Sequence, residues 1–279
     1  MNTNHRTARF SPSNRWLLVI LMLALLLRLI YALAQDHVTV LQSSGGDVTW
    51  YLTNGYELVT GKSHAPLPTA PLYLVFIGVV QVLLSRGAAA IIAIRIIQAG
   101  LGTVTCYLGF RLTRTLTATH WAGMLTAVVL AVSPVFIIEP AQLLTETLYI
   151  CLVTCGLWLY IEFVVRAEQP DKRHLALVGL ILGLATLTRA VLLLFPLGLV
   201  LHLILLRGCR QGLKQASLML TVYVLIVSTW TVYNLARWNR LVIGGDGFAA
   251  FVYMGARGWE GPSDLDEALQ EDVPEMAEG

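Results

Sequence analysis

The sequence predicts an all-α polytopic membrane protein with about seven transmembrane helices. Of its 279 residues, 56% are hydrophobic and only 13% are charged, and the mean hydropathy is +0.69. A soluble globular domain does not need so much apolar surface. Apolar runs of helical length recur along the chain, and short basic clusters separate them. The net charge of +2 is too small to indicate a nucleic-acid partner.

The N-terminal residues 1–15 are polar and basic, and they precede the first apolar run, 16–34. This order predicts a helix that starts membrane insertion and leaves the N-terminus in the cytoplasm. The small-x-small sequence at residues 32–34 also fits the cleavage site of a signal peptide. That alternative is disfavoured because Arg28 interrupts the apolar core.

The next segment, 35–69, is polar and rich in Gly and Pro, which predicts an external loop. The apolar run 70–85 follows and is only 16 residues long, roughly 24 Å as a helix, against the roughly 20 residues of a full span. If this run does not cross the membrane, every later basic cluster faces the cytoplasm. The positive-inside tendency therefore predicts a juxtamembrane helix within a first external loop of residues 35–89.

Six later apolar runs complete seven predicted spans: 90–110, 120–138, 141–165, 174–188, 190–206 and 216–235. The predicted transmembrane module thus covers residues 16–240. Residues 241–279 follow as an external Gly-rich, aromatic loop and a solvated acidic tail.

One acidic residue stands out in the first external loop. Asp47 lies in the stretch 45–57, beside Trp50 and Tyr51. A carboxylate at the membrane surface, flanked by aromatic side chains that favour the interface, can act as a base toward a lipid-linked substrate. The simpler alternative is a solvated turn residue.

Further ionisable residues are predicted at the external ends of the helices. Arg95 and Arg189 are flanked by apolar residues, and Arg237 follows the last span. Because a charge in hydrocarbon costs roughly 2.5 kcal/mol or more, such groups usually pair or bind a ligand; snorkelling to lipid headgroups is the alternative. Glu139 lies in the turn after the third span, and Glu146 is expected two turns further along the same helical face. For Glu146 an ion pair between helices is the alternative to catalysis.

These residues occur in an order that resembles the N-terminal module of the GT-C glycosyltransferases. The nearest groups are the protein O-mannosyltransferases, of glycosyltransferase family 39, and the aminoarabinose lipid A transferases. The resemblance rests on Gly46-Asp47-x-x-x-Tyr51, His64-x-Pro66, Pro71-Leu-Tyr73, Arg95-Ile-Ile-Gln98, Ser133-Pro134, Leu144-Thr145-Glu146, the end of the fifth span at Arg189, and Tyr233-Asn234. It extends from about residue 16 to residue 261.

The resemblance implies a membrane enzyme that takes a sugar from a polyprenyl-phosphate donor and transfers it with inversion. The acceptor is a lipid, a glycan or a protein, and the reaction takes place on the external side of the plasma membrane. Asp47 matches the family's general base, and Arg95 the arginine that holds the acid or the donor phosphate. The first external loop of the family also holds juxtamembrane helices, which agrees with the prediction for 70–85.

Other predicted roles follow from the chemistry of the side chains. Arg189 and Arg237 are expected to join Arg95 at the donor phosphate. The substrate cavity is expected to include Trp50, Tyr51, His64, Tyr73, Glu139 and Glu146. The sequence has no nucleotide-binding motif and no firm metal motif. Whether the protein uses a divalent metal ion stays open at this point.

Some departures from the family pattern keep alternatives open. Val48 follows Asp47 where many members have a second acid, so a two-acid site would need Glu57 or Glu139. The chain lacks the further helices and external domain of most members, which suggests a truncated product or one half of a split enzyme. A secondary transporter is the other alternative, although the candidate charges lie at the ends of helices and no internal repeat is visible.

Overall fold

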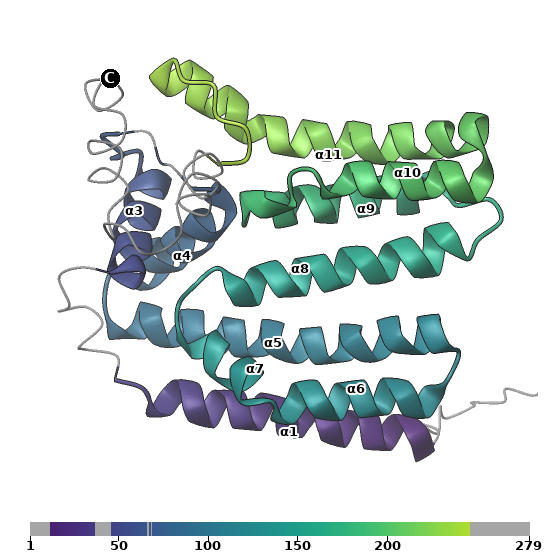
Figure 1. Cartoon of the computed structure of the whole chain (residues 1–279). Helices are drawn as coiled ribbons and strands as arrows, with labels where there is room; N and C mark the ends of the chain where they lie inside the picture. The colour runs from purple at the N-terminus through teal and green to yellow at the C-terminus, as the bar shows by residue number, and fades with distance from the viewer. Residues whose placement is uncertain (1–11, 37–45, 66, 68, 246–279) are drawn as a thin grey trace, which may run out of the picture.

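The computed structural model describes residues 12–36, 46–65, 67 and 69–245, and all regular structure in this part of the chain is helical (Figure 1). The helices are α1 (Pro12–Ala34), α3 (Asp47–Thr60), α4 (Pro71–Leu84), α5 (Ala88–Thr117), α6 (His120–Val132), α7 (Pro134–Ile138), the short η1 (Glu139–Ala141), α8 (Glu146–Leu159), the π-helical η2 (Tyr160–Val165), α9 (Lys172–Thr186), the short η3 (Ala190–Leu192), α10 (Phe195–Arg207) and α11 (Cys209–Trp238). The predicted all-α membrane fold is confirmed.

Among the described residues, five helices are long and apolar enough to cross a membrane, or six if α6 and the bent segment 134–141 form one span. Each predicted span coincides with one of the helices or helix pairs. The span predicted at 174–188 corresponds to α9, whose 15 residues make roughly 22 Å of helix, less than a full crossing needs. The total of seven spans therefore stays a prediction.

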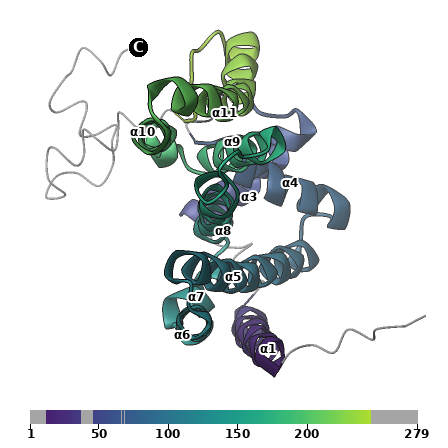
Figure 2. The ribbon, with the colours of Figure 1, turned by 90° about the vertical axis from the view of Figure 1, so that its right-hand side faces the viewer.

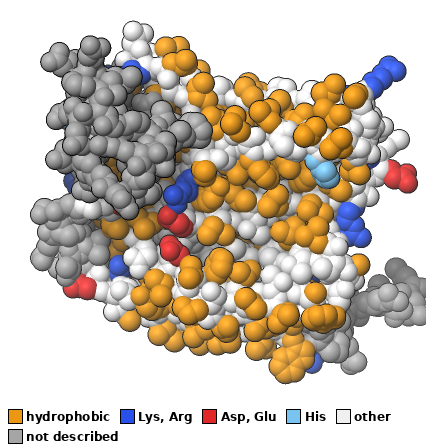
Figure 3. All heavy atoms as spheres, in the orientation of Figure 1, with side chains coloured by type: hydrophobic (Ala, Val, Ile, Leu, Met, Phe, Trp, Pro, Cys, Tyr) orange, Lys and Arg blue, Asp and Glu red, His pale blue; other side chains and the backbone are white. Residues whose placement is uncertain are grey.

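The long helices lie side by side and alternate in direction (Figure 1). We call the end that carries α3, α4 and η1 the α3/α4 end. We call the opposite end, with the turns α5–α6, η2–α9 and α10–α11, the basic end. Figure 3 shows hydrophobic side chains over the wide middle of one face, with the charged side chains toward the two ends. This distribution suits a protein whose middle contacts lipid.

Two short helices form a layer across one end of the long helices. Most of the long helices are seen end-on in Figure 2, whereas α4 is seen from its side. α3 packs on α4 so closely that a Cβ at Gly78 would lie 2.1 Å from the carbonyl oxygen of Gly55. Gln81 Nε2 donates to the oxygen of Leu52 at 2.8 Å. With its 14 residues, α4 is short for a span, as the sequence predicts for 70–85.

α3 is the part of this layer that the residue pattern did not predict. The stretch that the Gly and Pro content assigned to an external loop contains a 14-residue helix. Leu52 and Gly55 are its buried residues, and both lie against α4. Tertiary packing therefore outweighs the low helix propensity of the glycine.

A bend of 61° separates α6 from the segment 134–141. Pro134 has no N–H, so the carbonyl oxygen of Leu130 loses its usual donor in the helix. The buried Arg28 of α1 replaces it, because Nη2 donates to that oxygen at 2.9 Å and Nη1 to the oxygen of Ala131 at 3.5 Å. Gly102 leaves the room for this side chain, since a Cβ there would lie 2.8 Å from the Arg28 Nε.

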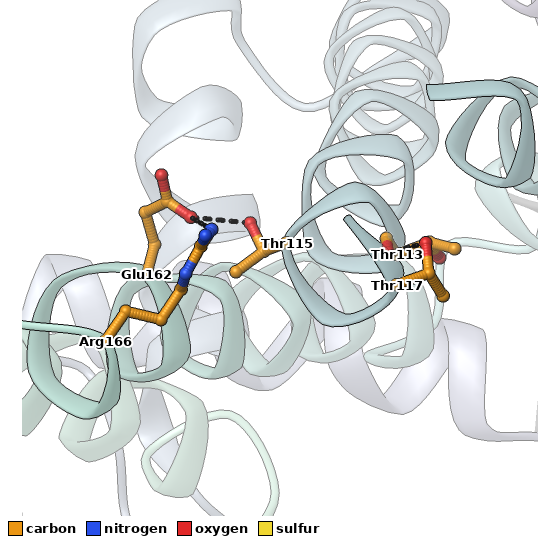
Figure 4. Close-up of polar contacts among 5 residues, drawn as sticks. All are labelled: Thr113, Thr115, Thr117, Glu162 and Arg166. Carbon is orange, nitrogen blue, oxygen red and sulfur yellow. Dashed lines mark hydrogen bonds and ion pairs between the residues drawn. The ribbon is translucent and has the colours of Figure 1, made fainter. Parts of the chain in front are cut away.

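Polar contacts join the helices at the basic end. The Glu162 carboxylate accepts a hydrogen bond from Thr115 of α5 at 2.6 Å and pairs with Arg166 at 3.5 Å (Figure 4). Arg207, in the last turn of α10, donates to the oxygens of Val164 and Val165 at 2.8 and 3.1 Å. These oxygens belong to the end of η2, where helix carbonyls lack a backbone donor.

The predicted N-terminal segment and C-terminal tail lie largely outside the described residues. Of the segment 1–15, the structure describes only 12–15, and of the loop and tail 241–279 only 241–245. The aromatic and acidic residues predicted in the tail therefore lie outside the described residues.

Candidate active site

An ion pair joins α8 and η3 at the α3/α4 end. Arg189, the residue before η3, donates from Nη1 to Oε1 of Glu146, the first residue of α8. Thr145 donates to the other oxygen of this carboxylate at 3.3 Å. The two side chains are 42% and 33% exposed, so a ligand at this end can reach both charges.

Glu139 adds a second carboxylate to this pair, and it interacts electrostatically with both Glu146 and Arg189. Its Oε2 is buried and has no hydrogen-bond partner in the described part of the chain. The expectation that Glu139 and Glu146 share one helical face is wrong, because η1 ends at Ala141 and Leu143 adopts a φ of 57° before α8 begins. The two carboxylates are brought together by a turn.

Asp47 is the first residue of α3 and is exposed. Gly46 before it has a φ of 83°, a conformation that glycine adopts without strain. The positive end of the helix dipole favours a carboxylate at this position. Asp47 is therefore an ionisable side chain that solvent or an acceptor can reach.

Tyr51, one turn after Asp47, connects it with the ion pair. Its ring lies within electrostatic range of Asp47, Glu146 and Arg189. Burial raises the pKa of Tyr51 above its ordinary value, and the negative charge of Asp47 raises this pKa further. The hydroxyl is neutral near pH 7, and it lies within hydrogen-bonding range of Thr145.

An aromatic row supports Tyr51 from both sides. The Trp50 and Tyr73 rings each lie 5.3 Å from the Tyr51 ring, edge to face, and Phe76 lies 5.9 Å from Tyr73. Tyr73 is fully buried. Of the aromatic residues predicted for the cavity, Trp50 and Tyr51 are therefore partly accessible, whereas Tyr73 fixes α3 on α4.

Arg95 is buried in α5; its Nε and Nη1 donate to backbone oxygens, and it also interacts electrostatically with Asp36. Nε donates to Ala141 at 3.0 Å, and Nη1 donates to Gln35 at 3.4 Å and to Asp36 at 3.3 Å. The guanidinium thus joins the segment after α1 to η1. The assignment of Arg95 to the donor phosphate stays a prediction.

Arg237 and His64 are exposed. The Arg237 guanidinium lies 5.0 Å from the centre of the Trp238 ring in the last turn of α11. His64 lies in the connection between α3 and α4. The contacts of the described residues do not link either side chain to the Glu146–Arg189 pair, and both roles stay predictions.

An apolar groove of about 450 Å³ lies between the α3/α4 layer and α11. Its lining consists of Leu58, Val59, Pro71, Leu72, Val75, Val79, Leu187, Thr229, Trp230 and Tyr233. Trp230 and Tyr233 stack with their ring centres 5.0 Å apart. The same hydrophobic cluster includes Trp50 and Tyr51, so the groove is continuous in packing with the aromatic row.

Three elements of this site were not predicted from the sequence. The groove was not predicted, because its lining comes from four separate segments. Thr145 belongs to the Leu144-Thr145-Glu146 motif, which did not predict that it bonds to Glu146. Tyr149 also lies within electrostatic range of Arg189, and its position one turn after Thr145 was the available signal.

No group of three or more His, Cys, Asp or Glu side chains in the described ranges could hold a metal ion. Asp47, Glu139 and Glu146 provide carboxylates at the α3/α4 end, but they do not form such a group. The chemistry that these residues offer is proton transfer and the binding of an anion by a guanidinium.

Together these features define a polytopic membrane protein with an acid–base and cationic site at one end of its helices, next to an apolar groove. Residues 68–233 match the family of dolichyl-phosphate-mannose-protein mannosyltransferases. The match covers more than half of the chain, and the chain belongs to this family of GT-C-type membrane glycosyltransferases. No curated protein matches the chain. The match includes Glu139, Glu146 and Arg189 but begins after Asp47, so the assignment of Asp47 rests on the motif resemblance.

Proposed function

We propose that this protein transfers a sugar from a polyprenyl-phosphate donor to an acceptor hydroxyl or amine at the α3/α4 end. Membership of the family supports sugar transfer of the mannosyltransferase type in a membrane. The observation that carries the proposal is the convergence of Asp47, Tyr51, Glu146 and Arg189 from three separate segments. This group combines a base, a neutral hydroxyl and a cation next to an apolar groove.

The donor is proposed to lie with its prenyl chain in the apolar groove and its phosphate toward Arg189. A guanidinium has five N–H donors, and the described ion pair occupies Nη1. The remaining donors can form two parallel bonds to phosphate oxygens, which are strong where water is scarce. Glu146 keeps the Arg189 side chain in place before the donor arrives.

The acceptor is proposed to approach Asp47. Asp47 takes the proton from the acceptor while the acceptor atom attacks the anomeric carbon of the sugar. The bond from that carbon to the phosphate oxygen breaks, and its electron pair leaves with the polyprenyl phosphate. Attack opposite the leaving group inverts the anomeric carbon. Arg189 stabilises the negative charge that develops on the phosphate.

Other predicted residues have supporting roles in this proposal. Arg95 connects the segment after α1 with η1 and so helps to position η1, which begins at Glu139. Glu139, with a buried and unpartnered oxygen in the described part of the chain, serves as the second acid that Val48 does not supply. Arg237 is a second phosphate contact from α11. In the proposed topology the site faces the external side of the plasma membrane.

The decisive test is Asp47→Asn, assayed in membranes that contain the full chain. A panel of labelled polyprenyl-phosphate sugars is supplied with and without a chelator, and transfer and donor binding are measured separately. Loss of a general base typically lowers the rate about 10²- to 10⁴-fold, and donor binding should not change. Because the substitution keeps the size of the side chain, a folding defect is not expected.

Glu57→Gln is the matched control, since it removes a carboxylate from the same helix α3. We expect it to keep near-normal transfer. Equal losses in the two variants would instead indicate a two-acid site that uses Glu57. Near-normal transfer by Asp47→Asn would contradict the assignment of the base.

A further inference from the structure

A wide cleft lies at the basic end, opposite the proposed active site. Its volume is about 1120 Å³. It lies between the beginning of α9, the end of α10 and the first turns of α11. The lining residues are Gln169, Pro170, Lys172, Leu175, Arg207, Gly208, Cys209, Arg210, Gln211, Lys214, Gln215 and Leu218.

The charge of this cleft is strongly one-sided. Lys172, Arg207, Arg210 and Lys214 line it, whereas its lining contains no Asp or Glu. Two carboxylates, Glu168 and Asp171, adjoin the lining in sequence but are not part of it. Glu168 is exposed, and Asp171 accepts from the backbone N–H of Arg173 at 2.9 Å and so caps α9. The positive potential of the cleft is therefore not neutralised by its own lining, which favours an anion.

The shape of the cleft is fixed by close helix packing. Gly208, with a φ of 77°, forms the sharp turn between α10 and α11. At Gly212 a Cβ would lie 2.6 Å from the oxygen of Leu203, so the two helices touch through their backbones. Arg207 is held by the carbonyls of Val164 and Val165. The basic groups thus belong to a preformed recess.

Two polar atoms of the lining lack partners. The Nε of Arg207 and the Oε1 of Gln215 are buried and make no hydrogen bond within the described residues. Unsatisfied groups of this kind are rare in folded proteins and usually mark a place where another molecule or water completes the bonding.

The surroundings favour a lipid over a soluble anion. Leu206 and Leu213 directly precede the lining residues Arg207 and Lys214 in sequence, and Leu205 precedes Leu206. Leu205, Leu206 and Leu213 are 77%, 47% and 52% exposed. Leu175 and Leu218 belong to the cleft itself. A ligand that carries both a phosphate and acyl chains would satisfy the cations and cover these side chains together.

We infer that this cleft binds the headgroup phosphate of an anionic phospholipid, with the acyl chains lying on the exposed leucines of α10 and α11. Basic recesses between membrane helices commonly hold such headgroups. The site is distinct from the proposed active site, because it lies at the other end of the helices and uses none of the same residues.

The test compares lipid retention in the full chain and in Arg210→Gln/Lys214→Gln. Both substituted side chains are exposed. The proteins are reconstituted in mixed phosphatidylcholine and phosphatidylglycerol nanodiscs and extracted gently, and the retained lipid is measured by native mass spectrometry. Because each basic group near a membrane surface contributes about a fivefold preference for anionic lipid, we expect the variant to retain phosphatidylglycerol at least about tenfold less.

Arg114→Gln/Arg173→Gln is the control, since it removes two exposed charges from the same end but outside the cleft lining. It should retain phosphatidylglycerol as the unmodified protein does. Equal losses in both double variants would overturn the inference and indicate a diffuse surface charge. Unchanged retention in Arg210→Gln/Lys214→Gln, or displacement of the lipid by inorganic phosphate alone, would overturn it as well.

Discussion

At the residue scale, the Glu146–Arg189 pair is the most informative interaction in the molecule. About a third to two fifths of each side chain is exposed to solvent. An ion pair with this much exposure contributes little to stability by itself. Because the pair lies close to Tyr51, and Tyr51 to Asp47, its proposed importance is for ligand binding and not for stability. A guanidinium that is already oriented loses less side-chain freedom when it binds a phosphate.

A conservative change at Arg189 tests this role. Arg189→Lys keeps the charge, but an ammonium cannot make two parallel bonds to a phosphate while it also pairs with Glu146. We expect the KM for the donor to rise about tenfold or more, since bonds to charged groups are worth roughly 1.5–3 kcal/mol, with a smaller effect on kcat. Steady-state kinetics with varied donor concentration measure both.

Arg237→Lys is the counterpart at the arginine proposed as the second phosphate contact. In the proposed function Arg189 carries the larger share of phosphate binding, so Arg237→Lys should raise the KM less. A larger rise in KM for Arg237→Lys than for Arg189→Lys would instead indicate that Arg237 of α11 makes the principal phosphate contact.

At the element scale, two devices shape the α3/α4 end. Arg28 supplies donors to the carbonyls at the break between α6 and α7, which stabilises the bend that leads to η1 and Glu139. The contact of Gly55 with Gly78 lets α3 lie directly on α4 and so places Asp47 and Tyr51. Both contacts thus position side chains of the site without being part of it.

The glycine contact leads to a prediction about stability. A Cβ at position 78 would lie 2.1 Å from the Gly55 oxygen, and backbone cannot yield as a flexible side chain can. We expect Gly78→Ala to lower the free energy of unfolding by about 1–3 kcal/mol, the usual effect of overpacking. It should also reduce transfer, because α3 carries Asp47. Thermal unfolding in detergent, followed by tryptophan fluorescence, measures the first effect.

Gly100→Ala in α5 is the comparison, because no atom of the described residues lies within 4 Å of a Cβ built there. Alanine favours a helix over glycine by about 1 kcal/mol, so this variant should be as stable as the unmodified protein or slightly more so. If Gly78→Ala behaved in the same way, the close approach of α3 and α4 would not be a constraint in the protein.

At the scale of the whole molecule, the two ends of the helices have different chemistry. The α3/α4 end combines carboxylates, aromatic rings and an apolar groove, whereas the basic end carries most of the cations of the interhelical turns. The positive-inside tendency predicts that the basic end lies in the cytoplasm. The proposed active site then faces the opposite side of the membrane.

Cysteine labelling tests this orientation. Cys209 is exposed at the basic end, whereas Cys106 and Cys151 are buried. In intact cells, a membrane-impermeant maleimide should leave Cys209 unlabelled until the membrane is opened. In Cys209→Ser/Lys62→Cys, the exposed position after α3 should react without opening the membrane. Labelling of Cys209 in intact cells would reverse the topology.

The sequence by itself determined the membrane class, the positions of the long helices and the short length of 70–85. These properties depend on composition, run length and charge, which act locally along the chain. Its ordered motifs also pointed to the family that the match over residues 68–233 confirms. The sequence also predicts Asp47, Glu146 and Arg189 as ionisable residues at one end of the helices.

Only the tertiary structure decided how those residues combine. α3 forms in a stretch whose glycines predict a loop, because packing on α4 stabilises the helix more than its local propensity does. The tertiary structure turned the chain between Glu139 and Glu146, directed Arg95 to backbone oxygens and joined four segments into a groove. Pairing, burial and cavity shape depend on contacts between residues far apart in the chain, and periodicity and charge counting carry no information about such contacts.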